Sequence, residues 1–229
     1  GGGWYRKSFL VPASMVGKRL SLYFEGVYMN SEVFVNGQSV GKRPYGYSSF
    51  AYDITPYIKV GEQNVIAVRV DNSKQRNCRW YTGAGIYRHV WLEKTGPVHL
   101  AQWPTYITTP EITQDYAVVK VQTTVTNTGN SEAEITVLQK VNGAQAVPAT
   151  ITLEPGTSGT VEQELRLPYP QLWSCESPHL YSMHTSMLVD GKVVDSKESS
   201  FGVRSIAWKK DGFYLNGEKV RLKGVCEHH

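Results

Sequence analysis

The chain has 229 residues, of which 41% are hydrophobic and 19% are charged, and its formal net charge is +4. This composition excludes an intrinsically disordered chain, and at roughly 150 residues per domain the length suits one large domain or two modest ones. Lys and Arg residues are scattered and no apolar run reaches the roughly 18 residues of a membrane-spanning helix, so neither a nucleic-acid-binding protein nor a membrane protein is indicated.

Strand-like stretches separated by tight turns run through the first hundred residues. Residues 32–35 (EVFV) alternate with period two, and residues 65–70 (VIAVRV) are a nearly continuous apolar strand. Asn-Gly and Asp-Gly pairs favour the two-residue type I′ hairpin turn, because both central residues of that turn need a positive φ. The sequence places such pairs at Asn36-Gly37, Asn142-Gly143, Asp190-Gly191 and Asn216-Gly217.

The rest of the chain has the same character. Residues 118–125 (VVKVQTTV) and 134–138 (EITVL) are rich in β-branched side chains, and residues 186–189 (SMLV) lead into the Asp-Gly turn. No window shows an amphipathic helical stripe with capping residues. Short strands spaced by about 8–12 residues, with turns between them, predict an all-β protein built of β-sandwiches.

A domain boundary is expected near residues 94–97 (KTGP). Thr- and Val-rich strands follow it and predict a compact immunoglobulin-like sandwich of about 100 residues, which closes near residues 201–204 (FGVR). A hairpin over residues 212–220 comes next, and then residues 221–225 (RLKGV) as one more strand. Because a strand without a partner cannot satisfy its backbone hydrogen bonds, we expect a third domain to begin here and to be cut off.

Cysteine usage and known motifs limit the chemistry. Cys78, Cys175 and Cys226 are far apart and form no C-x-x-C pair, so we expect no zinc site and at most one internal disulfide. The sequence has no nucleophile elbow, phosphate-binding loop or dinucleotide fingerprint. Its acidic residues lie mostly in turns and at alternating exposed positions, and no pair of catalytic carboxylates stands out. We therefore predict no cofactor and no metal.

Residues 71–91 are the most unusual stretch, with polar loop residues followed by aromatics and two glycines. Carbohydrate sites use this mixture, because aromatic faces stack on sugar rings while Arg and Asn bind hydroxyls. The alternative is a structural corner, in which Tyr87 and Trp91 fill the sandwich core. The structural interpretation is favoured for residues 86–91, and both interpretations stay open for residues 79–81 (RWY).

Two further stretches contain histidines beside Pro or Glu. Prolines in residues 168–181 fix an extended path that Trp173 is expected to pin to the sandwich, with His179 and His184 as ordinary surface or strand residues.

At residues 224–229 (GVCEHH), a Glu beside two His suggests acid–base chemistry or a metal. On an extended strand, however, neighbouring side chains point to opposite faces, and a tag remnant explains the two histidines equally well.

Several of these motifs together resemble glycoside hydrolase family 2, the family of β-galactosidases and β-glucuronidases. Residues 3–7 (GWYRK), 24–27 (FEGV) and 33–37 (VFVNG) resemble its N-terminal sugar-binding jelly roll. Residues 70–73 (VDNS) and 79–88 (RWYTGAGIYR) resemble the most recognisable signature of that domain.

The later motifs follow the same family in the same order. Residues 172–174 (LWS), 178–181 (PHLY) and 201–204 (FGVR) are similar to its immunoglobulin-like second domain. Residues 213–217 (FYLNG) and 222–225 (LKGV) resemble the entry to its catalytic TIM barrel. The resemblance covers essentially the whole chain.

The resemblance implies an all-β fold with a jelly-roll (galactose-binding-like) sandwich at residues 1–97 and an immunoglobulin-like sandwich at residues 98–204. It implies that residues 205–229 are the C-terminal stub of a truncated TIM barrel. The N-terminus also looks truncated, since the family usually has an earlier strand before the G-W-Y-R run.

The resemblance also suggests substrate-binding residues. The family commonly has Pro where Cys175 stands and Asn where Cys226 stands in its G-V-N-x-H run, but His228 still falls on the His of that run. By resemblance, His228 contacts the sugar near the reacting centre and helps to stabilise the transition state. Arg79 and Trp80 correspond to a part of the first domain that reaches toward the active site.

Family members are retaining enzymes that use two glutamates, whose carboxyl groups must lie about 5–5.5 Å apart. In the family both glutamates lie at the ends of later barrel strands, and Glu227 matches neither. We therefore expect this chain to be the non-catalytic N-terminal portion of a β-galactosidase and to be inactive alone. The expected substrate is a terminal β-linked sugar, which binds through the missing barrel. Export to the periplasm or beyond is favoured, because polysaccharide-degrading relatives are often exported. The alternative is a free-standing carbohydrate-binding or adhesion module of two β-sandwiches.

Overall fold

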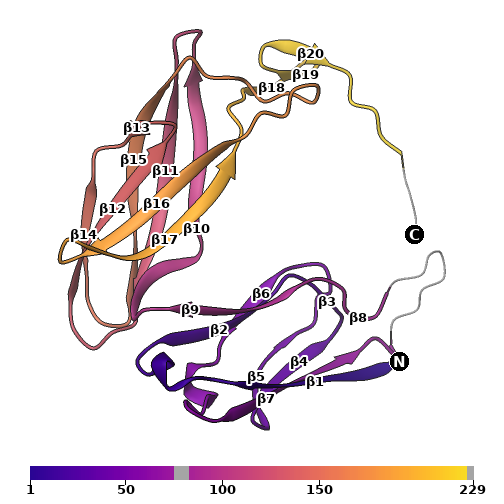
Figure 1. Cartoon of the computed structure of the whole chain (residues 1–229). Coiled ribbons are helices and arrows are strands. Elements are labelled where there is room, and N and C mark those ends of the chain that lie inside the picture. The colour runs from indigo at the N-terminus through magenta and orange to yellow at the C-terminus, as the bar shows by residue number, and fades with distance from the viewer. Residues whose placement is uncertain (75–82, 226–229) are drawn as a thin grey trace. The chain divides into compact units, whose positions relative to one another are not determined.

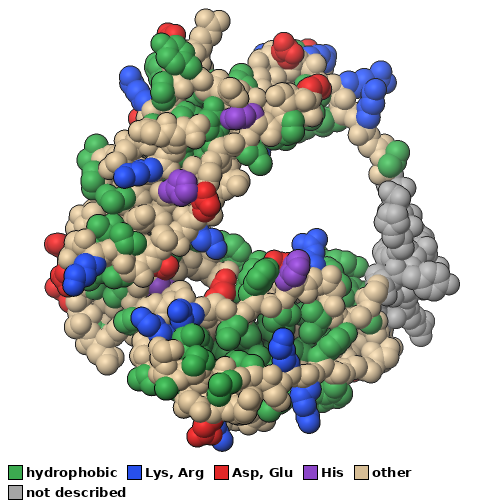
Figure 2. Space-filling view, viewed as in Figure 1, with side chains coloured by type: hydrophobic (Ala, Val, Ile, Leu, Met, Phe, Trp, Pro, Cys, Tyr) green, Lys and Arg blue, Asp and Glu red, His purple; other side chains and the backbone are tan. Residues whose placement is uncertain are grey.

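A computed structural model of the protein describes residues 1–74 and 83–225 (Figure 1). The fold is all-β, and the helical segments among the described residues are two short 3₁₀ turns, Ala13–Met15 and Thr55–Tyr57. Within these residues no helix is long and apolar enough to cross a membrane. Internal contacts divide the chain into two compact units, Gly1–Gly96 and Pro97–Val225. Lys and Arg side chains are scattered over the side of each unit that Figure 2 draws.

The first unit is an antiparallel sandwich, the jelly-roll part of the fold. One sheet has four strands in the order β1 (Gly2–Leu10), β7 (Gln63–Asp71), β4 (Ser31–Val35) and β5 (Gln38–Arg43). The other has the order β6 (Phe50–Asp53), β2 (Arg19–Phe24) and β9 (Val90–Thr95), and a short pair joins β3 (Val27–Tyr28) to β8 (Gly85–Ile86).

The core of this unit is formed by side chains at alternate positions of its strands. Val33 and Val35 of β4 are fully buried, whereas Glu32 and Phe34 between them are half-buried. Leu22 and Phe24 of β2 pack into the same apolar cluster from the other sheet. Strand β7, which the sequence predicts as nearly continuously apolar, buries one face and exposes Arg69 on the other. Each sheet of the sandwich therefore keeps a face outside the core.

The second unit is the immunoglobulin-like sandwich. Its three-stranded sheet has the order β10 (Val98–Ile112), β11 (Tyr116–Asn127) and β15 (Thr157–Pro168). The facing five-stranded sheet contains β13 (Ala144–Gln145), β12 (Ala133–Val141), β16 (Tyr181–Val189) and β17 (Lys192–Phe201), and β14 (Ala149–Leu153) also pairs with β12. Two apolar clusters lie between these sheets, and each draws side chains from both.

The four predicted hairpin turns are confirmed. Both residues of each turn have a positive φ, for example 49° at Asn36 and 84° at Gly37. Trp173 pins residues 168–181 to the sandwich as predicted, because it donates its backbone N–H to the Val203 oxygen at 2.8 Å and packs against Gly202. His184 is exposed on β16, and His179 is half-buried with its ring 4.7 Å from that of Tyr181.

Two expectations are wrong, a strand at residues 221–225 and core positions for Tyr87 and Trp91. Residues 221–225 belong to no strand, and the last sheet is the antiparallel β18 (Ile206–Lys209), β19 (Gly212–Leu215) and β20 (Glu218–Val220). No barrel stub is visible in the described chain. Tyr87 and Trp91 do not fill the core, because they are 46% and 50% exposed. Trp91 lies on β9, at the edge of its sheet, and the polar tip of each ring has a partner outside the core.

Candidate functional site

The three residues predicted to bind substrate all lie outside the described part of the chain. Arg79 and Trp80 belong to residues 75–82, and His228 belongs to residues 226–229. The structure does describe the segments on either side of residues 75–82, together with the end of β7 and the start of β8. The site can therefore be built from these neighbouring residues.

Asp71, the last residue of β7, begins the stretch predicted to be functional. Its backbone N–H donates to the Met29 oxygen at 3.1 Å, and Asn30 Nδ2 donates to its carbonyl at 2.9 Å. Its side chain accepts the Ser73 backbone N–H at 2.9 Å, which forms a tight turn. Hydrogen bonds from Ser73, and then the charge of Arg69, lower the pKa of Asp71, so this carboxylate is ionised.

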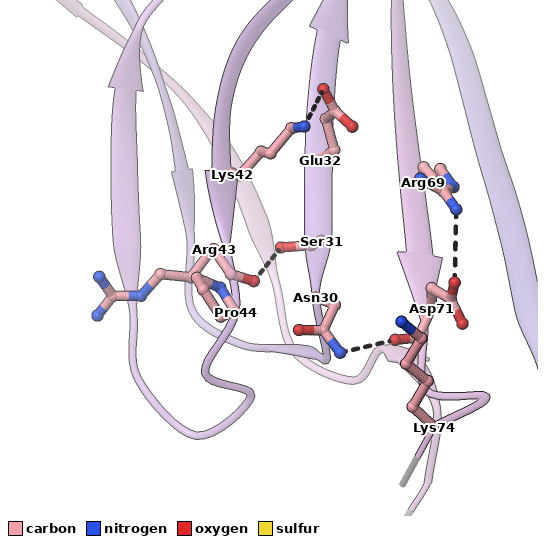
Figure 3. A pocket seen from close by; sticks show the side chains of 9 residues that line it. All are labelled: Asn30, Ser31, Glu32, Lys42, Arg43, Pro44, Arg69, Asp71 and Lys74. Carbon is pink, nitrogen blue, oxygen red and sulfur yellow. Dashed lines mark hydrogen bonds and ion pairs between the residues drawn. The ribbon is translucent and has the colours of Figure 1, made fainter.

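A groove of about 320 Å³ opens beside this turn (Figure 3). Polar and charged side chains predominate in its lining, which consists of Asn30, Ser31, Glu32, Lys42, Arg43, Pro44, Arg69, Asp71 and Lys74. Four of these residues are basic and two are acidic, so the lining has a surplus of positive charge. The groove is thus better suited to an anionic group than to a cation.

Two ion pairs lie in the lining of the groove. Lys42 Nζ lies 3.4 Å from Glu32 Oε1, and Arg69 Nη2 lies 3.4 Å from Asp71 Oδ2. Figure 3 shows the Arg43 guanidinium pointing away from the other labelled side chains, and it binds Ser48 Oγ at 2.6 Å. The basic groups that remain for the groove are therefore Lys42, Arg69 and Lys74.

A cluster of tyrosines forms a second feature of the first unit. The rings of Tyr28 and Tyr47 lie 5.2 Å apart, and those of Tyr45 and Tyr47 lie 5.8 Å apart. Tyr87 Oη donates to the Gly46 oxygen at 2.8 Å. A Cβ at Gly46 would lie 2.4 Å from Tyr28 Cδ2, so only glycine lets this loop approach the ring. The sequence reasoning missed this cluster, although the run Tyr45-Gly46-Tyr47 was a signal for it.

Glu25 is the centre of a third arrangement. It accepts hydrogen bonds from Trp91 Nε1 at 2.9 Å and pairs with His89 Nδ1 at 3.0 Å. The hydrogen bond from Trp91, followed by that from His89, lowers the pKa of Glu25. Through these hydrogen bonds Glu25 clamps the edge strand β9 to the end of β2, and its lowered pKa disfavours a role as a proton donor.

Among residues 1–74 and 83–225 no group of three or more His, Cys, Asp and Glu side chains could hold a metal ion. Cys175 is an exposed free thiol in the loop that precedes β16. The polar and aromatic groups of the three features above are tyrosine rings, basic side chains and paired carboxylates.

Comparison with known proteins extends these observations. The model of the glycosyl hydrolases family 2 sugar binding domain matches residues 1–96, and the model of glycosyl hydrolases family 2 matches residues 98–204. A β-galactosidase of Bacteroides ovatus is 44% identical over the whole chain, and a putative β-glucuronidase of Formosa agariphila is 45% identical over 99% of it. The chain spans only 28% and 22% of the length of these two relatives.

Solved structures agree with the sequence relatives. A family 2 glycosyl hydrolase from Bacteroides cellulosilyticus superposes over the whole chain with a TM-score of 0.94 and 42% identity, and the chain covers 32% of it. A β-glucuronidase from family 2 superposes over 97% of the chain with a TM-score of 0.90 and 30% identity, and the chain covers 26% of it. The chain therefore belongs to glycosyl hydrolases family 2, as shown by the two family models, by these relatives and by the order of the chain's two sandwiches.

Proposed function

We propose that this chain is the non-catalytic N-terminal portion of a longer retaining glycoside hydrolase, a β-galactosidase that removes terminal β-linked sugars. One observation carries the proposal: the chain is 44% identical over its whole length to a β-galactosidase but spans only 28% of that relative. The remaining length is sufficient for a catalytic domain.

The carboxyl groups of the described residues also support a non-catalytic role for this chain. A retaining mechanism needs two carboxyl groups about 5–5.5 Å apart, one of them protonated to act as the acid. Glu25 is held ionised by Trp91 and His89, and the carboxyls of Glu32 and Asp71 are each paired with a basic group. In the proposed protein both catalytic glutamates belong to a barrel that follows the two sandwiches.

The proposed role of this chain is to support that barrel and to contribute to its substrate site. The proposed contributors are Arg79 and Trp80 from the loop of the first sandwich, and His228 from the segment after the second. Residues 1–97 and 98–204 are the two proposed accessory domains, and residues 205–229 are the proposed start of the catalytic barrel. Arg and Trp side chains suit the hydroxyls and the apolar face of a sugar.

A β-glucuronidase is the second candidate. It is favoured by the 45% identity to a putative β-glucuronidase over 99% of this chain. The two candidates differ in one group of the substrate, a hydroxymethyl in galactosides and a carboxylate in glucuronides. Activity assays can therefore separate them directly.

The test compares this chain with the complete product of its gene on nitrophenyl β-galactoside and nitrophenyl β-glucuronide. We expect hydrolysis only by the complete product, and a faster reaction with the galactoside. A faster reaction with the glucuronide would select the second candidate. Turnover by the 229-residue chain alone would contradict both. A native product no larger than 25.6 kDa, detected with an antibody to this chain, would indicate a free-standing binding module instead.

A further inference from the structure

The outer face of the four-stranded sheet in the first unit carries a row of side chains that spans all four strands. Trp4 of β1 lies opposite Arg69 of β7, Arg69 lies opposite Glu32 of β4, and Glu32 lies opposite Lys42 of β5. Residues directly opposite one another project from the same face of a sheet. The intervening positions of β4 and β7 are buried in the core, so this row, the Trp4–Lys42 row, faces outward.

The row has the dimensions of a short oligosaccharide. Neighbouring strands lie about 4.8 Å apart, so three intervals extend over ~14 Å. Three members of the row also line the groove of about 320 Å³: Glu32, Arg69 and Lys42. The groove is deeper than the sheet face and adds a further basic group, Lys74. Figure 3 shows how Lys42, Glu32 and Arg69 lie above the Asp71 turn. An elongated ligand could therefore lie across the strands and enter the groove.

An aromatic platform stands at the β1 end of the row. Trp4 is 64% exposed, although tryptophan is among the costliest side chains to leave in water. Its ring packs against Phe34 with 5.6 Å between the ring centroids, so the indole is supported from one side. An indole held in place while much of it stays exposed is suited to stacking on the apolar face of a sugar ring.

The rest of the row favours negative charge on the ligand. Glu32 is only 15% exposed and is satisfied by Lys42 at 3.4 Å and by Ser39 Oγ at 2.9 Å. Lys42 and Arg69 are 70% and 49% exposed, and their ion pairs of 3.4 Å are long. Both basic groups are thus open to solvent and loosely paired, so they can also contact an anion on a ligand.

We propose that the Trp4–Lys42 row and its groove form an accessory site for an acidic oligosaccharide. Trp4 stacks on one sugar ring, while Arg69, Lys42 and Lys74 bind carboxylate or sulfate groups on the others. The choice of a saccharide rests on the proposed function, but the site does not use Arg79, Trp80 or His228 and takes no part in bond cleavage. It would hold an acidic polysaccharide to the enzyme.

The test uses the purified chain and isothermal titration calorimetry. The probes are trigalacturonate, its full methyl ester, and a sulfated galactose trimer. We expect an acidic trimer to bind about tenfold more tightly than the methyl ester, and its binding to weaken as sodium chloride is added. Binding of either acidic trimer supports the site, and the tighter of the two identifies the anion.

Variants of the row test whether the acidic trimer binds to this face. Trp4→Ala, Arg69→Gln and Lys42→Gln should each weaken the binding of the acidic trimer about tenfold. The matched controls are Trp208→Ala, which removes a 73% exposed tryptophan packed on Phe213 in the second unit, and Lys192→Gln on β17. These controls should bind as the unchanged chain does. Circular dichroism and thermal unfolding of each variant establish that it is folded.

Three results would overturn the inference: no binding of either acidic trimer, equal binding of the neutral ester, or unchanged binding by all three variants of the row. Such a failure is separate from a failure of the proposed function. The latter is read from hydrolysis by the complete gene product, and the former from binding to this chain.

Discussion

At the centre of the second sandwich, one amide side chain joins the two sheets. Gln139 of β12 is fully buried, and its Nε2 donates to Thr123 Oγ1 of β11 at 2.7 Å. Its Oε1 accepts from Thr185 Oγ1 of β16 at 2.8 Å. Because β11 lies in one sheet and β12 and β16 in the other, this polar bridge spans the interior between the two apolar clusters.

Replacing Gln139 by Leu should destabilise the second unit by ~2–4 kcal/mol, because it leaves two buried threonine hydroxyls without their partner. The free energy of unfolding, measured in urea, checks this value. The exposed Gln145→Leu is the control and should change stability by less than about 0.5 kcal/mol.

The combined variant Gln139→Leu, Thr123→Val and Thr185→Val should recover most of that loss. Replacing all partners of a buried hydrogen-bond network by apolar groups of similar shape is close to neutral. If the triple variant is no more stable than Gln139→Leu, the cost arises from packing rather than from unsatisfied hydroxyls.

Glu25 makes the first unit sensitive to acid. Hydrogen bonds from Trp91 and then His89 lower its pKa below the ordinary value of 4.5. A carboxyl with a lowered pKa in the folded state stabilises the fold fully above its unfolded pKa, and this contribution is lost as the pH falls through the folded pKa. The unfolded chain takes up the proton first, which gives the effect its sign.

We therefore expect the difference in melting temperature between the unchanged chain and Glu25→Gln to be constant near neutral pH. It should shrink below about pH 4.5, where the unfolded chain begins to be protonated. Thermal unfolding between about pH 3 and pH 7 measures it, with the exposed loop variant Glu176→Gln as the control. A difference that grows on acidification would contradict the proposed clamp.

At the scale of the element, the hairpins depend on backbone conformation more than on contacts. Gly143 in the turn between β12 and β13 has a φ of 81°, and among the described residues no atom lies within 4 Å of the place where its Cβ would be. A side chain would therefore meet no obstacle at this position. The requirement for glycine comes from the left-handed conformation alone.

Gly143→Ala should cost about 1 kcal/mol of unfolding free energy, since the left-handed region disfavours any residue with a Cβ. Gly3→Ala in β1 is the matched comparison, because its added methyl also meets no described atom within 4 Å and its φ is not positive. This second change should be neutral. Equal losses at both sites in urea unfolding would mean that the turn conformation is not the cause.

Strand β9 shows that a hydrophobic pattern does not determine how deeply a strand is buried. Val90, Trp91 and Leu92 are 40%, 50% and 48% exposed, although the sequence interpretation placed Trp91 in the core. The position of β9 at the edge of its sheet explains the exposure, because no further strand covers its outer side within the described chain. Period-two alternation predicts that a strand exists but not its place in the sheet.

At the scale of the molecule, each compact unit has a core of its own. The first is built around Phe24, Val33 and Val68, and the second contains the two clusters around Met183 and Met187. A core enclosed by the strands of a single unit is sufficient for a domain of about 100 residues to fold alone.

We therefore expect residues 1–96 and residues 97–225 to fold when they are produced separately. Each should have the circular dichroism of a β protein and unfold in urea with one cooperative transition, because small single domains unfold in this way. A fragment without a cooperative transition would show that its core depends on the other unit. Mixing the two fragments provides the control, since independent units should unfold unchanged in the mixture.

Local features of this protein could be derived from the sequence alone. The four hairpin turns follow from the conformations of Asn-Gly and Asp-Gly, and the strands follow from alternation, because both depend on residues that are neighbours in the chain. The order of motifs along the chain was likewise sufficient to recognise the family. Residues 221–225 form no strand, although Leu222 and Val225 suit one, because a strand forms only where it has a partner.

Only the tertiary structure decided which distant residues meet. Trp4, Glu32, Lys42 and Arg69 lie on four strands, and the pairing of β1 with β7 and of β7 with β4 brings them into one row. Gln139 meets its threonines only because two sheets pack face to face. Turn and strand preferences are local and can be read along the sequence, whereas strand order, register and sheet packing result from the burial of apolar surface by the whole domain.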